Sequence, residues 1–385
     1  MKDTLKLWVP ECYAKAGCLP GNGEHPAKLA YFAHLVTTKR PDASGFVRLN
    51  WSVLREQIDN RSISQARQLF GPQLEISPHE VGVRATGFRW NFDFVPAQIA
   101  FNAPHFVAKL QRYKERKRRE YNELEANLEA VLRGVTLDVD DVPEAVAALP
   151  DKPGTISEPH RRFVIAQQLE QVKAGDFGII SRSSRTGRVH CLHNRIHKEF
   201  RQHILFNGEN SSEYDLASSQ PYFLSKMFSC PQLSKAVLEG SFYKRLNDVL
   251  KCPKDLDDPL VYDAFKESVL ATIYARPING FKYWLEGDGA AAEIWIAMGR
   301  VYPGVCEFIS GYTNKHGDTA LAIELQRRES KIFVEGQLSS LLAQGVPAIP
   351  LHDGLLVPTE KGKLVKKELE KRLPGGRVRG EERGI

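Results

Sequence analysis

The sequence predicts a mixed α+β fold divided into at least two domains. The chain has 385 residues, more than one small hydrophobic core normally organises. Residues 1–105 contain two helix-like segments followed by two strand-like ones, and beyond residue 160 helical and strand-like apolar segments alternate to about residue 358. With 42% apolar and 26% charged residues, the composition is that of an ordinary globular protein.

Charge and cysteine content exclude several classes of protein. Lysine and arginine number 53 against 47 acidic residues, and this net charge of +6 permits a polyanionic partner without requiring one. No run of 18 apolar residues occurs and the first fifteen residues lack an apolar signal core, so we expect a cytoplasmic protein without membrane contact. The six scattered cysteines form no CxxC pair, which indicates reduced thiols rather than a disulfide scaffold or a structural zinc site.

Residues 1–105 are expected to form a small domain of their own. The segment VRLNWSVLREQID starts like a strand and continues with helical spacing, Asn60 interrupts it, and SISQARQLF forms a second helix that ends at Gly71-Pro72. The following segment, LEISPHEVGVRATGFRWNFDFV, alternates like two strands joined by a turn. Two helices and a ribbon resemble a winged helix-turn-helix. Such a module binds nucleic acid or packs on protein, and both roles stay open.

Residues 106–160 are expected to form a polar helix, 106–133, followed by an acidic linker, 134–160, with four prolines. The first half of the helix is strongly basic, and Lys117 and Arg118 are candidate nucleic-acid contacts. A solvated face is the alternative for this charge run. We expect the main domain over residues 161–360 and a flexible basic tail over 361–385, which is rich in Gly and Arg.

Two aspartates lie next to apolar segments, where a carboxylate needs a neighbouring cation. Asp215 ends a strand-like segment, and Asp353 lies in VPAIPLHDGLLVP, where two apolar runs flank a turn as in a β-hairpin with an acid at its tip. A carboxylate between hydrophobic flanks is costly unless it is paired or bound to a cation. Side by side, the two would form a site for Mg²⁺, which prefers few carboxylates plus water and phosphate oxygens. A turn or cap role is the alternative for each.

Between them, DAFKESVLATIYARP places Lys266, Leu270 and Tyr274 on one helix face, because they recur every four residues. Opposite two metal ions, this face would hold a triphosphate with Lys266 and cover the sugar and base with Leu270 and Tyr274. A solvated lysine on a helix that otherwise packs in the core is the ordinary alternative.

The order of these motifs resembles the polymerase region of family A DNA polymerases and, more distantly, the phage-type single-subunit RNA polymerases. Asp215 matches the motif A aspartate, and Lys266 with Tyr274 matches motif B, K-x7-Y-G, on the fingers helix. His352 and Asp353 match the H-D pair of motif C.

Further segments follow the same family order over about residues 180–360. The sequence T-G-R occurs at 186–188 and Y-P-G-V at 302–305, and Gln326 falls where the family has a glutamine-bearing helix near the template strand. The resemblance implies a right-hand polymerase with an antiparallel palm sheet and helical fingers and thumb, preceded by the winged-helix-like domain. Residues 106–160 are then a possible thumb element.

The resemblance implies template-directed nucleotidyl transfer without proofreading, in the replication of a phage or mobile element. The expected enzyme extends a primer 3′-hydroxyl with deoxynucleoside triphosphates on a nucleic-acid template, with DNA favoured. Asp215 and Asp353 hold two Mg²⁺ ions, for which Mn²⁺ substitutes, and Lys266 is catalytic. A primase or small RNA polymerase that starts chains, an inactive winged-helix DNA-binding replication initiator, and an accessory replication protein as partner stay open. A metal-dependent nuclease is disfavoured, because it usually gathers three or more acids.

The sequence also departs from the family pattern. Gln220 replaces the motif A glutamate, and because its volume is similar we expect it to crowd a 2′-hydroxyl and favour deoxynucleotides. Tyr262 replaces the motif B arginine, Ala275 the motif B glycine, and Gly354 the motif C glutamate. A triphosphate contact is then expected from Arg276 or from a basic residue in 195–201.

The remaining expected contacts to nucleic acid come from polar and basic side chains near the motifs. They are Thr186, Arg188, Arg195, Arg201, Gln326 and His352.

Overall fold

The computed structural model describes residues 4–15, 19, 21–39, 41–42, 44–77, 85–151, 157–274 and 289–381. Two compact units form: unit 1 comprises Met1–Ala126, Thr136–Ile179 and Arg195–Phe200, and unit 2 comprises Asn127–Val135, Ile180–Asn194 and Arg201–Ile385. The fold is mixed α+β, and the registered strand pairs in the described residues are antiparallel. Residues 136–179 therefore group with the amino-terminal residues.

The elements from the start of the chain to residue 173 lie in unit 1, apart from α6 and β6, which cross the boundary. They are β1 (Thr4–Pro10), α1 (Glu11–Ala14), α2 (Glu24–Thr38), β2 (Val47–Arg48), α3 (Trp51–Gln57), α4 (Asn60–Phe70), η1 (Gly71–Gln73), β3 (Leu74–Ser77), β4 (Gly87–Trp90), β5 (Pro96–Asn102), α5 (Pro104–Arg119), α6 (Glu123–Leu132), β6 (Val135–Leu137), α7 (Val142–Ala147) and α8 (Glu158–Lys173).

The expected order of two helices and a ribbon is present in unit 1. Asn50 caps α3 and Asp59 caps α4, each through a side chain that accepts a hydrogen bond from a backbone N–H of the first turn. Strands β3 and β4 then pair antiparallel, and β2 joins β4. The apolar faces close on Phe32 and Phe88, whose ring centroids lie 5.1 Å apart. Residues 78–84, between β3 and β4, lie outside the described residues.

The expected single helix over 106–133 is in fact two helices. Helix α5 ends at Arg119 and α6 begins at Glu123. The Asn122 side chain accepts from the Glu125 N–H at 3.1 Å, and the Glu125 carboxylate accepts from the Asn122 N–H at 2.9 Å. This reciprocal pair is a capping box, which satisfies the free N–H groups of a new helix and so favours a start at this point.

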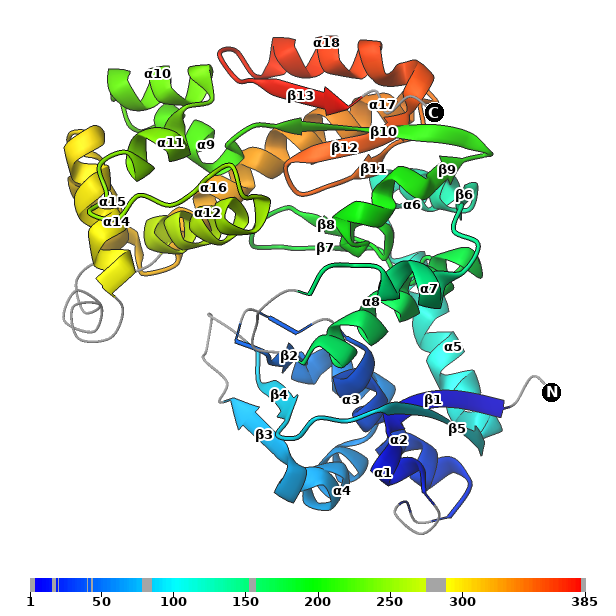
Figure 1. Cartoon of the computed structure of the whole chain (residues 1–385). Helices are drawn as coiled ribbons and strands as arrows, with labels where there is room; N and C mark the ends of the chain where they lie inside the picture. The colour runs from blue at the N-terminus through cyan, green and yellow to red at the C-terminus, as the bar shows by residue number, and fades with distance from the viewer. Residues whose placement is uncertain are drawn as a thin grey trace. The chain divides into compact units, whose positions relative to one another are not determined.

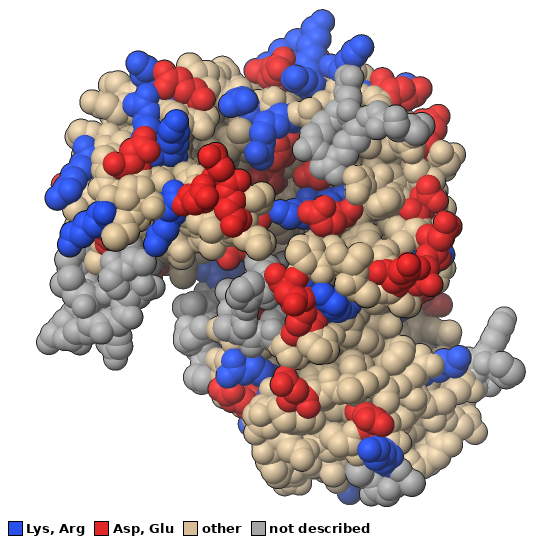
Figure 2. Space-filling view, in the orientation of Figure 1, with Lys and Arg blue, Asp and Glu red and all other residues tan. Residues whose placement is uncertain are grey.

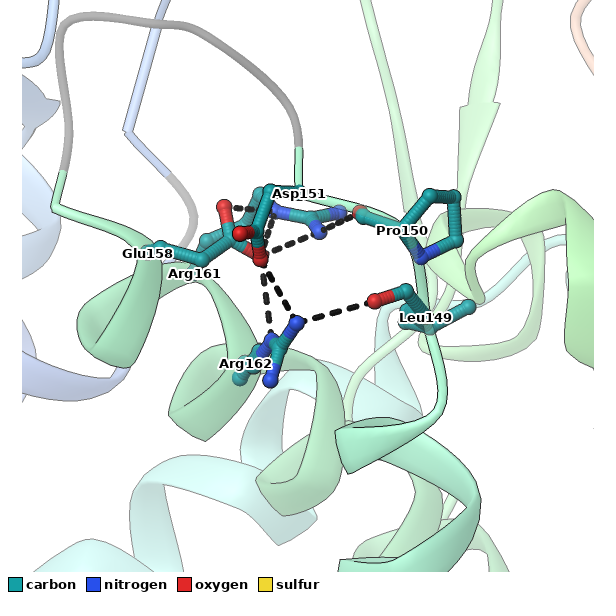
Figure 3. A network of polar contacts seen from close by, with 6 residues as sticks. All are labelled: Leu149, Pro150, Asp151, Glu158, Arg161 and Arg162. Carbon is teal, nitrogen blue, oxygen red and sulfur yellow. Dashed lines mark hydrogen bonds and ion pairs between the residues drawn. The ribbon is translucent and has the colours of Figure 1, made fainter.

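The expected linker over 134–160 contains regular structure as well. Asp141 caps α7 by accepting from the Glu144 N–H at 2.9 Å. Figure 3 shows how two arginines of α8 hold the chain before it: Arg161 donates to the carbonyl of Pro150 at 2.8 Å, and Arg162 donates to the carbonyl of Leu149 at 2.9 Å. These contacts connect residues 149–151 to α8.

Unit 2 contains the elements from β7 onward, apart from parts of η2 and η3. They are β7 (Ser181–Arg182), β8 (Val189–His190), η2 (His193–Arg195), η3 (Lys198–His203), β9 (Ile204–Phe206), β10 (Glu209–Leu216), α9 (Ser219–Met227), α10 (Pro231–Glu239), α11 (Phe242–Asn247), α12 (Pro259–Tyr274), α14 (Gly289–Val301), α15 (Val305–His316), α16 (Ala320–Ser330), the π-helical η4 (Lys331–Leu338), α17 (Ser339–Ala343), β11 (Ile349–Pro350), β12 (Gly354–Pro358), η5 (Thr359–Lys361), α18 (Gly362–Arg372) and β13 (Val378–Glu381).

The main sheet of unit 2 is built around β10, which pairs antiparallel with β12, β13 and β9. Strands β11 and β12 form the hairpin expected from the VPAIPLHDGLLVP segment. All five residues of β12 are buried. Figure 1 shows β10, β12 and β13 side by side, with α18 next to β13. The end of β10 therefore lies between the hairpin and the carboxyl-terminal strand.

The expectation of a flexible tail from residue 361 is wrong, because Gly362–Arg372 form α18 and Val378–Glu381 form β13. Val365, Leu369 and Leu373 are buried, and their four-residue spacing is a helical pattern that packs α18 on unit 2. The lysines between them are exposed to solvent, and the high content of charged residues that they cause is the reason the segment looked flexible from its composition.

In the residues the structure describes, no helix combines the length and the apolarity needed to cross a membrane. Cys230, Cys252 and Cys306 are free thiols. On the face drawn in Figure 2, basic and acidic side chains are interspersed over both units.

Candidate functional site

Asp215 and Asp353, which are 138 positions apart in the chain, are neighbours in unit 2. Asp215 lies opposite Gly354 in the β10–β12 register, and the Leu216 N–H donates to the carbonyl of Asp353 at 2.9 Å. The charge of Asp353 acts on Asp215 electrostatically. The sheet therefore brings together the two acids on which the sequence prediction depends.

Two glycines let α18 and β13 pack closely against β10. Tyr214, the residue before Asp215, is 2% exposed and packs on the opposite face of the strand. A Cβ at Gly362 or Gly380 would collide with its ring. These glycines let α18 and β13 lie directly against Tyr214.

Asp215 forms an ion pair that the sequence analysis missed. Arg379 of β13 lies opposite Asp215 in register, and its Nε donates to Oδ1 at 2.9 Å while its Nη2 donates to Oδ2. Burial raises the pKa of Asp215 and the charge of Asp353 adds to this, whereas Arg379 and Lys266 lower it. The site thus holds two acids that need cations nearby.

Glu213 is a third acid on the same strand face, two residues before Asp215. Arg201 donates from Nη1 to its Oε1 at 3.0 Å. Burial raises the pKa of Glu213, Arg201 opposes this, and Asp215 and Asp353 add to it. The alternating Glu-Tyr-Asp was the available signal for Glu213. Arg201, expected to contact nucleic acid, is bonded to Glu213.

Helix α12 presents the expected stripe. Lys266, Leu270 and Tyr274 are all half-buried, whereas Phe265 and Val269 of the same helix are in the core. The positive charge of Lys266 lowers the pKa of Asp215. Burial raises the pKa of Tyr274, and the charges of Glu329 and Asp353 add to this while Arg188 opposes it. Lys266 and Tyr274, at the two ends of the stripe, therefore both interact electrostatically with acids of the site. Arg276, another expected nucleotide contact, lies outside the described residues.

A buried carboxylate, Glu329 of α16, organises the far end of the site. Its exposed fraction is 1%, and its Oε1 accepts from Ser219 Oγ and Gln220 Nε2, each at 2.7 Å. Its Oε2 accepts from Arg188 Nε at 3.0 Å. Burial raises the pKa of Glu329 to about 7, although Arg188 lowers it. Leu321, Leu325 and Glu329 share four-residue spacing, so an acid on an apolar stripe was the missed signal.

These bonds engage two side chains that the sequence analysis assigned to substrate. Arg188, an expected nucleic-acid contact, pairs with Glu329. Gln220, an expected nucleotide contact, is 7% exposed, and its Oε1 has no hydrogen-bond partner among the described residues. The amide of Gln220 thus combines one fixed donor with one unused acceptor inside the site.

The other expected contacts are divided between the two units. Thr186 lies in the turn before Arg188 and bonds Ser183. Gln326 is half-buried on α16, and His352 is exposed with its ring centroid 6.1 Å from that of His190. Three expected contacts belong to unit 1: Lys117 pairs with Glu120 at 2.8 Å, the Arg118 guanidinium lies 5.2 Å from the Phe177 ring centroid, and Arg195 is exposed.

The donor set suits a divalent cation held jointly with a substrate. No cluster of three or more His, Cys, Asp or Glu arranged to hold a metal occurs in the described part of the chain. Mg²⁺ is commonly held by one or two carboxylates, with water and substrate phosphates completing its coordination. Asp215 and Asp353 match that two-carboxylate pattern, and the burial that raises the pKa of Asp215 is what a bound cation would offset.

The chain is similar to the POL domain of Pol1 from M. smegmatis, solved in complex with DNA primer-template and dNTP, at 12% identity and a TM-score of 0.40, covering 72% of each chain. No family model matches the chain. No curated protein matches it either.

Proposed function

We propose that this chain is a nucleotidyltransferase that extends a primer 3′-hydroxyl on a nucleic-acid template, with DNA favoured. The observation that carries the proposal is the adjacency of Asp215 and Asp353 at one end of a sheet, next to a helix that presents Lys266. Two neighbouring carboxylates and a lysine are the groups that phosphoryl transfer with a metal–triphosphate substrate requires.

Asp215 and Asp353 are the residues that would hold Mg²⁺ or Mn²⁺. When bound in such a site, two divalent ions lower the pKa of the attacking hydroxyl and neutralise charge on the phosphates.

The chain's own residues bind and orient the nucleotide. The Lys266 ammonium attracts the triphosphate and stabilises the charge that develops on the pyrophosphate leaving group. Leu270 and Tyr274, on the same half-buried stripe, cover the sugar and base. In this proposal β10, β12 and β13 are the palm, α12 belongs to the fingers, and Gln220 limits the space beside the sugar, which favours deoxynucleotides.

A chain-starting enzyme is the second candidate. Its support is the helix–helix–ribbon arrangement of unit 1, which suits recognition of an origin or promoter sequence. An inactive DNA-binding initiator is disfavoured because Asp215, Asp353 and Lys266 have no role in it.

The deciding experiment is extension of a labelled primer on DNA and RNA templates with each nucleotide type, beside an unprimed control. We expect primer-dependent incorporation that requires Mg²⁺ or Mn²⁺. Asp353→Asn should lower turnover by orders of magnitude while template binding is retained, and the exposed Asp248→Asn should leave turnover unchanged. Normal incorporation by Asp353→Asn overturns the proposal, and products in the unprimed reaction favour the chain-starting enzyme.

A further inference from the structure

The two side chains of the Arg379–Asp215 ion pair differ in how much of each is exposed to solvent. The Asp215 side chain is 18% exposed, whereas that of Arg379 is 51% exposed. Arg379 uses Nε and Nη2 on the two carboxylate oxygens, and its Nη1 has no hydrogen-bond partner among the described residues. The guanidinium therefore covers the acid on one side and is open to solvent on the other.

The surroundings of the guanidinium connect it to the rest of the site. Asp353 and Tyr262 both act electrostatically on Arg379. Tyr262 lies on α12, one four-residue step before Lys266, so it belongs to the same helix face. Arg379 and Lys266 thus both supply positive charge to Asp215, one from a strand and one from a helix.

A guanidinium and a divalent cation compete for Asp215. A bidentate arginine engages both carboxylate oxygens, which are the atoms that a metal ion would use. The backbone of Arg379 is held by the β10–β13 register, so a displaced side chain remains next to the acids. Phosphate is the other partner whose geometry a guanidinium matches bidentately.

We propose that Arg379 is an exchangeable partner of Asp215: it neutralises this carboxylate in the absence of a divalent cation, and it binds the phosphates of the incoming nucleoside triphosphate once a cation takes the carboxylate. This inference rests on the proposed function and adds a phosphate-binding residue from the carboxyl-terminal strand. The competing explanation is a structural ion pair that only holds β13 on β10.

Equilibrium binding separates the two explanations, because they predict opposite changes in Mn²⁺ affinity when Arg379 is replaced. Mn²⁺ binding to the full chain without nucleotide is measured by electron paramagnetic resonance, and binding of a deoxynucleoside triphosphate with Mg²⁺ by calorimetry. We expect Arg379→Gln to bind Mn²⁺ several-fold more tightly and the triphosphate at least tenfold more weakly. Arg379→Lys, which keeps the charge and loses the bidentate fork, should lie between Arg379→Gln and the unmodified chain.

Arg377→Gln is the matched control. Arg377 is exposed and two residues away, and its guanidinium lies over Gly240 rather than at the acids. We expect both affinities of this variant to be unchanged, and thermal unfolding of each variant verifies that it is folded.

Weaker Mn²⁺ binding by Arg379→Gln, or an unchanged triphosphate affinity, overturns the inference and leaves the proposed function intact. If the unmodified chain incorporates no nucleotide on any template, the proposed function fails. The two titrations still decide the role of Arg379 in that case, because neither measures turnover.

Discussion

Gly354 lies directly opposite Asp215 in the β10–β12 pair, and a Cβ added at position 354 would lie 2.9 Å from the Cα of Asp215 and collide with the Tyr214 carbonyl oxygen. Real Cβ atoms do not approach backbone this closely. The hairpin can therefore present Asp353 beside Asp215 only if residue 354 has no side chain. A glutamate at position 354 therefore does not fit this chain.

Gly354→Ala should consequently destabilise unit 2 and misplace the acids. Overpacking of this kind costs about 1–3 kcal/mol, measured as the loss in free energy of unfolding in urea. The rate of primer extension should fall by more than the loss of folded protein explains, because β10 and β12 must separate at the point where both aspartates lie. Gly311→Ala on α15 is the control, since its Cβ would meet nothing within 4 Å and alanine favours the helix by up to about 1 kcal/mol. Equal effects of the two substitutions would contradict this account.

Glu329 should make the stability of unit 2 depend on pH. Burial raises its folded pKa from 4.5 to about 7, so the folded state favours the protonated acid. This contribution to stability is fully present below about pH 4.5 and is lost as the pH rises through 7. Melting temperatures between pH 5 and 8 should fall with pH, and Glu329→Gln should flatten that dependence. The exposed Glu335→Gln serves as control, and an unaltered slope in Glu329→Gln would rule the effect out.

Gln220→Gly should raise the ratio of ribonucleotide to deoxynucleotide insertion, because it removes volume that we propose lies beside the sugar. It also removes one hydrogen bond to Glu329. Ser219→Ala removes the neighbouring hydrogen bond to the same oxygen with little loss of volume, so it isolates that second effect. Competition between labelled nucleotides on one primer-template gives the ratio. A similar ratio in both variants would show that volume at residue 220 does not select the sugar.

Asp59→Ala should destabilise the helix–helix–ribbon part of unit 1 by about 1 kcal/mol, the usual cost of losing an N-cap. The Asp59 carboxylate accepts from the Ser62 N–H at 2.8 Å and pairs with Lys28 at 3.0 Å. Burial acts to raise the pKa of Asp59, but these hydrogen bonds outweigh it and hold the pKa below its usual value, so the stabilisation is lost as the pH falls. Asp59→Asn keeps the cap without the charge and should lose less. Hydrogen exchange along α4 measures both, and unchanged protection in Asp59→Ala would refute the cap.

Local patterns in the sequence predicted the elements that local physics determines. The helices α3 and α4, the stripe on α12 and the hairpin around Asp353 depend on residues within a few positions of one another. The capping box at Asn122 and the apolar spacing of α18 were also legible, but charged neighbours obscured them.

Pairings between distant segments required the tertiary structure. The bond from Arg379 to Asp215 spans 164 positions and that from Arg188 to Glu329 spans 141, and no spacing rule connects such residues. Sheet order decides the first, because β13 pairs with β10 at Asp215, and the contact of α16 with the turn at 183–188 decides the second. The sequence by itself thus indicated that Asp215 and Asp353 need a cation. The fold decided that Arg379 pairs with Asp215 and Arg188 with Glu329, since ion pairing depends on distance in space and not along the chain.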